Sequence, residues 1–149
     1  MIRQFRLEDS AACCSLIQEC LASDTSLSSG LREMLQHSET PQSMEERARM
    51  FFVAVFESGG RILGIAGLEL NEIRLLCVSP EHRRSGIGRA LVEYIKSLVP
   101  DILFPDIFVY SSIQGRDFYG ACGFKEKGPV IFNIGGEQLS TVFMTFPLC

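Results

Sequence analysis

The chain has 149 residues, of which 46% are hydrophobic and 21% are charged, and its net charge is -4. This length and composition predict one globular domain over residues 1–149 and exclude a largely disordered chain. The negative charge argues against a nucleic-acid partner and mildly favours an amine-bearing one. No apolar run reaches the roughly 18 residues of a membrane span, and the N-terminus lacks an apolar signal-peptide core. We therefore expect a cytoplasmic protein with no membrane partner.

The cysteines do not form a metal-binding pattern. They stand at positions 13, 14, 20, 77, 122 and 149, without a C-x-x-C pair, and only His37 and His82 could join them as ligands. We therefore expect no metal site. Cys13 and Cys20 fall on the apolar stripe of a predicted helix, where core packing is the expected role.

The first third of the chain predicts one short strand followed by helices. The strand falls within residues 2–6, and a helix begins near residues 8–10, where acidic side chains suit the positive end of the helix dipole. Residues 22–43 are weakly hydrophobic and contain a short helix at "LREMLQH". Ser43 and Glu46 have the spacing of a capping box for another short helix.

The middle of the chain predicts an antiparallel meander. The apolar runs "FFVAVFE" (51–57) and "RILGIAGLEL" (61–70) are separated by the tight-turn sequence "SGG". A third run, "IRLLCV" (73–78), follows after "NE". Three strands joined by turns therefore form the centre of the expected sheet.

The clearest helix signal follows the meander. Apolar residues recur on one helical face and stop before Pro100; they are Ile87, Ala90, Leu91, Tyr94, Ile95 and Leu98. Beyond it, "DIFVY" (106–110) predicts a strand and "QGRDFYGAC" (114–122) a short helix ended by Gly123. The runs "VIFNI" and "LSTVFMTF" then predict a hairpin. Strands and helices are mixed along the chain, which is typical of an α/β fold.

A glycine-containing segment at the start of this helix has the chemistry of an anion site. In "EHRRSGIGRALV" (81–92), Gly86 and Gly88 stand where unpaired backbone N–H groups meet the positive helix end. Glycine lets a phosphate approach the backbone closely, and arginines can pair with its oxygens; the arginines here are Arg83, Arg84 and Arg89. The pattern favours a pyrophosphate ligand. The alternative is that the glycines only allow close packing and the arginines are solvated.

Two common phosphate-binding motifs do not fit this segment. A dinucleotide-binding motif needs a third glycine, but that position holds Leu91. A P-loop needs G-K-[ST] after the glycines, and the sequence does not have it. The R-x-x-G-x-G pattern therefore stands apart from both.

A second motif further along the chain raises the specificity. "DFYGACGF" (117–124) has the form F-Y-x-x-x-G-F. Together with "IRLLCVSPEHRRSGIGRAL" (73–91), it resembles the GCN5-related N-acetyltransferase (GNAT) superfamily, whose order of elements matches nearly the whole chain. The resemblance implies a mixed α/β fold with a mostly antiparallel central sheet, one parallel strand pair at the acetyl-CoA site, and flanking helices.

The resemblance also implies which residues bind acetyl-CoA. In the family, the strand before the loop pairs its main chain with the pantetheine arm, and the loop holds the pyrophosphate. The implied cofactor-binding residues are Leu76, Cys77, Val78, Arg83, Arg84, Ser85, Gly86, Ile87, Gly88, Arg89, Ser112 and Tyr119. Arg84 replaces a usual glycine and suits the loop if its backbone angles are ordinary. Ser112 replaces a frequent asparagine but can still hydrogen-bond.

Amine acetylation calls for proton transfer at both ends of the reaction. An amine with a lysine-like pKa of about 10.4 is almost fully protonated at pH 7, so a proton must be removed before attack. Glu72 matches the glutamate base of histone-acetylating members, with Glu69 as a neighbouring alternative. Tyr119 matches a tyrosine that protonates the leaving thiolate, and the Val78 N–H is implied to stabilise the oxyanion. The alternatives are a solvated strand-end carboxylate and a core tyrosine.

The resemblance favours transfer of acetyl from acetyl-CoA to a primary amine of a small molecule, by direct attack through a tetrahedral intermediate. A ping-pong mechanism, in which a cysteine first takes the acetyl group, is disfavoured, because Cys77 and Cys122 fall in apolar surroundings away from any histidine. Arg74 could anchor a substrate carboxylate, although such an arginine is more often a surface residue. A protein or peptide acceptor and an acyl-CoA-binding module without turnover are the alternatives.

The fold also implies where the acceptor binds. Residues 22–50 and the hairpin around Gly135 and Gly136 are expected to wall the acceptor site, and neither carries a recognisable substrate signature. Homodimers are frequent among the proteins that this chain resembles, so a homodimer is a further expectation.

Overall fold

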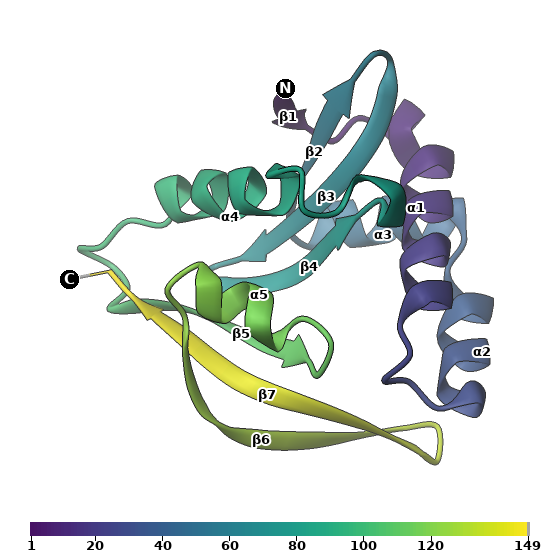
Figure 1. The fold of residues 1–149 in the computed structure, drawn as a ribbon. Coiled ribbons are helices and arrows are strands. Elements are labelled where there is room, and N and C mark those ends of the chain that lie inside the picture. Colours follow the sequence, from purple (N-terminus) through teal and green to yellow (C-terminus); the bar gives the residue numbers. More distant parts are fainter. Residues whose placement is uncertain (149) are drawn as a thin grey trace.

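A computed structural model describes residues 1–148 as a seven-stranded sheet with helices packed on both faces (Figure 1). The strand order is β1-β2-β3-β4-β5-β7-β6, in which β4 and β5 run parallel and the other neighbouring pairs antiparallel. The mixed fold expected from the sequence, with a parallel pair at the predicted cofactor strand, is confirmed.

The elements lie where the sequence patterns place them. The strands are β1 (Ile2–Gln4), β2 (Phe52–Ser58), β3 (Arg61–Glu69), β4 (Glu72–Val78), β5 (Asp106–Ser112), β6 (Lys125–Ile134) and β7 (Glu137–Pro147). The helices are α1 (Ser10–Ser23), α2 (Ser29–Ser38), α3 (Pro41–Met50), α4 (Ile87–Leu98) and α5 (Arg116–Ala121), with short 3-10 turns η1 (Leu7–Asp9) and η2 (Pro80–His82). None of the helices within residues 1–148 is long and apolar enough to cross a membrane.

The predicted cap of α3 was wrong in position. Thr40, rather than Ser43, is the N-cap: its Oγ1 accepts from the Ser43 N–H at 3.0 Å, and the Ser43 Oγ accepts from the Thr40 N–H at 2.9 Å. Pro41 explains the earlier start, because its fixed φ suits the first helical position and it has no N–H to satisfy.

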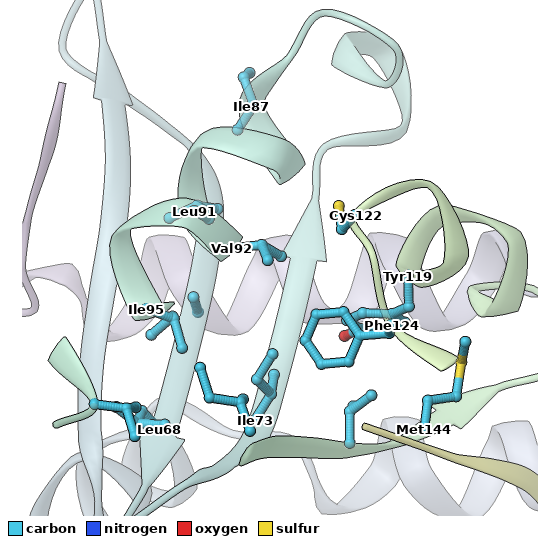
Figure 2. Packing of buried hydrophobic residues seen from close by; sticks show 14 of the residues in the cluster. Leu68, Ile73, Ile87, Leu91, Val92, Ile95, Tyr119, Cys122, Phe124 and Met144 are labelled. Carbon is cyan, nitrogen blue, oxygen red and sulfur yellow. The ribbon is translucent and has the colours of Figure 1, made fainter. Parts of the chain in front are cut away.

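Two hydrophobic clusters pack on opposite faces of the sheet. α4 and α5 cover one face, as Figure 2 shows for Leu91, Ile95, Ile73, Tyr119 and Phe124. α1 and α3 cover the other face, where the buried residues are Cys13, Leu16, Ile17, Met44, Val53, Val55 and Ile65. Because neighbouring strand residues point to opposite faces, β3 and β4 contribute to both clusters.

The apolar face of α4 is rotated from the predicted stripe. Leu98, expected in the core, is 40% exposed, whereas Val92, which the stripe left out, is fully buried. Gly88 is also buried, which lets this side of the helix approach its neighbours closely. The helix still begins and ends where the sequence predicts.

The first half of β4 contains a β-bulge, which changes the face of the sheet to which the next side chains point. Ile73 pairs with Leu68 and Leu75 with Gly67, so Arg74 has no partner residue on β3. As a result Ile73 joins the cluster under α4, whereas Leu75 packs against the cluster under α1. The bulge turns Arg74 to the surface.

α2 is held against the turn of the β6–β7 hairpin, at the right-hand end of Figure 1. The Ser28 hydroxyl donates to the Glu137 carboxylate at 3.5 Å. A methyl group on Gly135 would lie 2.9 Å from the Met34 sulfur, so these two residues are in contact. The two segments expected to wall the acceptor site therefore meet.

A charged cluster joins the N-terminal strand to β2. Arg3 donates to both carboxylate oxygens of Asp9, at 2.8 and 3.0 Å, and also bonds to Glu57. The Asp9 carboxylate also accepts from the Arg6 N–H at 2.8 Å. These bonds, those of Arg3 first, hold the pKa of Asp9 below its ordinary value.

Replacing Asp9 by alanine should lower the free energy of unfolding by about 3 kcal/mol at neutral pH, because the partly buried Arg3 guanidinium loses its main partner. A lowered folded pKa stabilises the protein above the unfolded carboxyl pKa near 4 and less as pH falls, so the difference should shrink in acid. Urea denaturation at several pH values measures both effects. Glu8→Ala, at an exposed neighbour, is the matched control, and an equal loss there would contradict the role of Asp9.

Candidate active site

The centre of the site is the C-terminal half of β4, where the strand loses its partner on one side. β4 and β5 pair only at Glu72↔Phe108 and Ile73↔Val109. On the other side, the Ser79 N–H donates to the Leu63 carbonyl at 2.8 Å. Because the bonds of an antiparallel ladder alternate, the main-chain groups of Leu76 and Val78 face away from β3. These groups form the open edge of β4.

The open edge is accessible from outside. Leu76 and Val78 are only half-buried although β4 lies in the middle of the sheet. An extended ligand with amide groups can therefore add to this edge as another strand would. The main chain of Cys77 faces β3 by the same alternation, so this residue offers its side chain rather than its N–H.

The loop after β4 leads directly to the N-terminus of α4. Gly86 is the N-cap residue with φ +91°, and a methyl group there would meet no atom within 4 Å. No side chain caps the helix, so its first N–H groups stay available to an anion beside the positive helix end. Gly86 thus combines a left-handed backbone with open space in front of the helix.

Gly88 has a different role from Gly86. A methyl group on Gly88 would lie 3.0 Å from the Phe118 ring and 3.5 Å from a Val78 methyl group. Its missing side chain lets α4 pack against α5 and β4. The packing alternative raised by the sequence therefore accounts for Gly88, and Gly86 is the residue that leaves room for a ligand.

The three arginines of the loop differ in their contacts. Arg83 donates to the Ser23 hydroxyl of α1 at 3.1 Å, and Arg89 donates to the Ala121 carbonyl of α5 at 3.0 Å. Arg84 has φ +65°, so the condition that its backbone angles be ordinary is not met. It adopts the left-handed conformation that the usual glycine would favour.

The remaining loop residues have mostly structural contacts. The Ser85 hydroxyl donates to the His82 carbonyl, and the Ile87 side chain is buried, so Ile87 can offer only its N–H. The Ser112 hydroxyl accepts from the Gly115 N–H at 3.0 Å and shapes the turn into α5.

Tyr119 points from α5 towards the strands, with Phe124 beside it (Figure 2). Its ring packs against Phe118 and Phe124, with centroids 5.3 and 5.4 Å away, and the residue is 7% exposed. Burial raises the pKa of its phenol, with smaller contributions from Cys77 and Cys122. Among residues 1–148 the hydroxyl has no hydrogen-bond acceptor. A protonated donor is therefore held next to the core without a protein partner.

Glu72 lies at the start of β4, at the first of the two positions where β4 and β5 pair. Desolvation by burial raises the pKa of its carboxyl above the ordinary value, although Arg74, 3.7 Å away, lowers it in part. Arg74 also pairs with Glu69 at 3.1 Å. The two candidate carboxylates thus share one arginine, and Glu72 is the more buried of them.

A hollow of about 360 Å³ opens beside Glu72; it is lined by Glu72, Ile73, Arg74, Tyr110 and Phe132. The Tyr110 and Phe132 rings meet edge to face, with centroids 5.2 Å apart. Residues from β4, β5 and β6 therefore join in one small site whose walls are both charged and aromatic.

Sequence reasoning missed two contacts across the open edge. The Cys20 thiol of α1 donates to the Val78 carbonyl at 3.4 Å, and the Thr25 N–H donates to the Gln114 side chain at 3.2 Å. The apolar spacing correctly placed Cys13 in the core, but it gave no signal that Cys20 reaches β4. Cys77, expected to be buried, is half-buried.

Comparisons with known proteins agree with this geometry. The family described as "Acetyltransferase (GNAT) domain" matches residues 22–138. An uncharacterized N-acetyltransferase of Chlorobaculum tepidum is 28% identical over 130 residues, which are 84% of this chain and 75% of the relative. A GCN5-related N-acetyltransferase structure from Rhodopseudomonas palustris has a TM-score of 0.91 at 20% identity, covering 99% of this chain and 95% of that one. YncA of Salmonella typhimurium, solved with its cofactor acetyl-CoA, has a TM-score of 0.75 at 17% identity, covering 100% and 94%.

The fold, the open edge of β4 and the family match define an acyltransferase that uses acetyl-CoA as its co-substrate. The chain belongs to the GNAT acetyltransferase family. The family, the enzyme class and the co-substrate inferred from the two sequence motifs are confirmed.

Replacing Arg83 and Gly86 together by alanine should weaken acetyl-CoA binding by about 2 kcal/mol or more, roughly 30-fold in Kd. The variant loses one cation beside the predicted pyrophosphate and strains the left-handed N-cap. Calorimetric titration measures the affinity, with NADH as a control ligand. Arg61→Ala, at the exposed start of β3, controls for net charge, and unchanged binding by the double variant would exclude the loop as the pyrophosphate site.

Proposed function

We propose that this protein transfers acetyl from acetyl-CoA to the primary amine of a small molecule. The observation that carries the proposal is the hollow of about 360 Å³ beside Glu72, at the point where β4 and β5 part. Its volume lies at the lower end of the range for small-molecule sites. A compact acceptor fits such a hollow better than a folded protein surface does.

The walls of the hollow suit a cationic amine on a partly apolar body. Glu69 and Glu72 share the single charge of Arg74, which leaves the cluster with excess negative charge. The rings of Tyr110 and Phe132 add aromatic surface, which attracts both apolar groups and cations. Charge therefore draws the ammonium form to the site, and the aromatic rings hold the rest of the molecule.

Glu72 is the general base of this proposal. A half-buried carboxyl with a raised pKa accepts a proton more readily near neutral pH than a solvated one does. Proton transfer from the ammonium group to Glu72, directly or through water, leaves a neutral amine. The amine nitrogen then attacks the thioester carbonyl carbon, so that an N–C bond forms and the C–S bond breaks.

Two groups at the other side of the open edge stabilise the charge that develops. The N–H groups of Leu76 and Val78 point towards the space left by β5 and can donate to the carbonyl oxygen as it becomes negative. The Tyr119 phenol, kept protonated by its raised pKa, supplies the proton for the leaving thiolate. The general base, Glu72, thus lies on β4, and the general acid, Tyr119, lies on α5.

Tyr119→Phe should lower kcat by about 100-fold and leave the Kd of acetyl-CoA nearly unchanged, because only the donated proton is lost. Steady-state kinetics and calorimetry on the same preparation separate the two quantities. Tyr94→Phe, on α4, is the matched control. Full turnover by the Tyr119 variant would remove this residue from the mechanism.

Glu72→Gln should reduce kcat/KM by about 100-fold and abolish the decline of the rate in acid, since the unprotonated carboxylate is the active form. Steady-state rates of the parent protein and the variant over a range of pH measure both effects.

Small primary amines with apolar bodies should be acetylated with a higher kcat/KM than peptides that offer an N-terminus or a lysine. A competition assay between amines and peptides measures this preference. Faster acetylation of peptides would favour a protein acceptor, and tight acetyl-CoA binding without any turnover would favour a non-catalytic module.

A further inference from the structure

Four aromatic side chains form a cluster on the sheet face to which Glu72 points. Glu72 pairs with Phe108 of β5, and Tyr110 of β5 pairs with Phe143 of β7, so these side chains share one face. The Tyr110 ring centroid lies 6.0 Å from that of Phe108, 5.2 Å from that of Phe143 and 5.2 Å from that of Phe132 on β6. The aromatic cluster therefore begins beside Glu72 and crosses three strands.

The core on this face of the sheet does not extend over the aromatic cluster. Among the described residues, the buried cluster under α1 and α3 contains none from β5, β6 or β7. α2 reaches this half of the sheet at the β6–β7 turn, where Met34 contacts Gly135. Tyr110 is 38% exposed and Phe132 is 39% exposed. Exposed aromatic side chains that gather in one place mark a binding surface.

The two outer rings of the cluster suit an aromatic guest. Tyr110 and Phe132 both line the hollow beside Glu72, and their ring planes meet at 87°. A planar ring in this corner can lie parallel to one of them and perpendicular to the other. Offset stacking and edge-to-face contact are the two preferred geometries of aromatic pairs. An alkyl group in the same place would gain contact area but not these ring contacts.

The charges around the hollow provide for one ammonium group. Arg74 lies 3.1 Å from Glu69 and 3.7 Å from Glu72, so one negative charge is left over at this end. Tyr110 and Phe132, at the other end, are neutral rings. A second ammonium group in their corner would leave water without a carboxylate partner, and cation–π attraction offsets that cost only in part. A neutral aromatic ring avoids the cost.

The strand geometry sets the distance between the two ends. Tyr110 lies two residues beyond Phe108, the partner of Glu72, which is about 7 Å along β5. A short alkyl spacer spans the gap between an amine beside Glu72 and a ring in the corner. We propose that the acceptor is an arylalkylamine whose ring lies in the corner of Tyr110 and Phe132, and that Phe132 determines this preference. The inference rests on the proposed function, which places the amine beside Glu72.

The experiment compares phenethylamine with cyclohexylethylamine, which has the same spacer and a saturated ring. The parent protein should acetylate phenethylamine with a kcat/KM about fivefold higher, as expected of one or two aromatic contacts. Phe132→Leu keeps an apolar side chain but removes the aromatic ring. It should bring the two amines within about twofold of each other, mainly by raising KM for phenethylamine, since the ring contact binds ground state and transition state alike. Unchanged acetyl-CoA affinity by calorimetry verifies that the variant is folded.

Ile131→Leu is the matched control. Ile131 is the next residue of β6, is 58% exposed and points to the opposite face, so this variant should keep the preference of the parent protein. Equal kcat/KM values for the two amines with the parent protein would overturn the inference and leave the proposed function standing. A preference that persists in Phe132→Leu would also overturn it.

Two further measurements separate this inference from the proposed function. A higher kcat/KM for cadaverine, a linear diamine, would place a second cation in the corner and overturn the inference. Ligand-observed NMR of phenethylamine with the protein and coenzyme A reports binding without turnover. Acetylation of no small amine, with phenethylamine binding still weakened by Phe132→Leu, would contradict the proposed function but support the aromatic corner as a ring-binding site.

Discussion

The short parallel pairing between β4 and β5 is the constraint on which the rest of the site depends. The two strands share hydrogen bonds only around Glu72 and Ile73, and β5 then turns towards β7. A central strand normally satisfies both edges within the sheet, because unpaired backbone groups are costly when buried. Here Leu76 and Val78 keep one edge open, so this edge has room for an extended amide-bearing ligand to complete the ladder. The fold therefore creates the proposed cofactor site by withholding a strand partner.

The packing of α4 on α5 fixes the chemistry beside that edge. Gly88 allows the Phe118 ring to approach α4, and cationic side chains of α4 bond to carbonyls at the end of α5: Arg89 to Ala121 at 3.0 Å and Lys96 to Cys122 at 2.8 Å. These contacts hold α5 and thus the position of Tyr119. Gly88, which belongs to the predicted phosphate-binding segment, therefore also helps to position Tyr119, the proposed proton donor.

Charge is divided along β4. The cationic loop follows the C-terminal end of the strand, and the carboxylates of Glu69 and Glu72 lie at its N-terminal end. This division suits the proposed reaction, because an anionic cofactor and a cationic acceptor would be drawn to opposite ends of one strand.

The sequence by itself determined the order of elements, the family and the candidate residues of loop and helix, because periodicity and glycine positions are local properties. It misplaced what depends on a neighbour: the rotation of α4 that exposes Leu98, and the left-handed angles of Arg84. Only the tertiary structure decided which edge of β4 stays open, that Glu72 is more buried than Glu69, and that Cys20 reaches Val78. These features arise from contacts between segments far apart in the chain, and no local pattern encodes them.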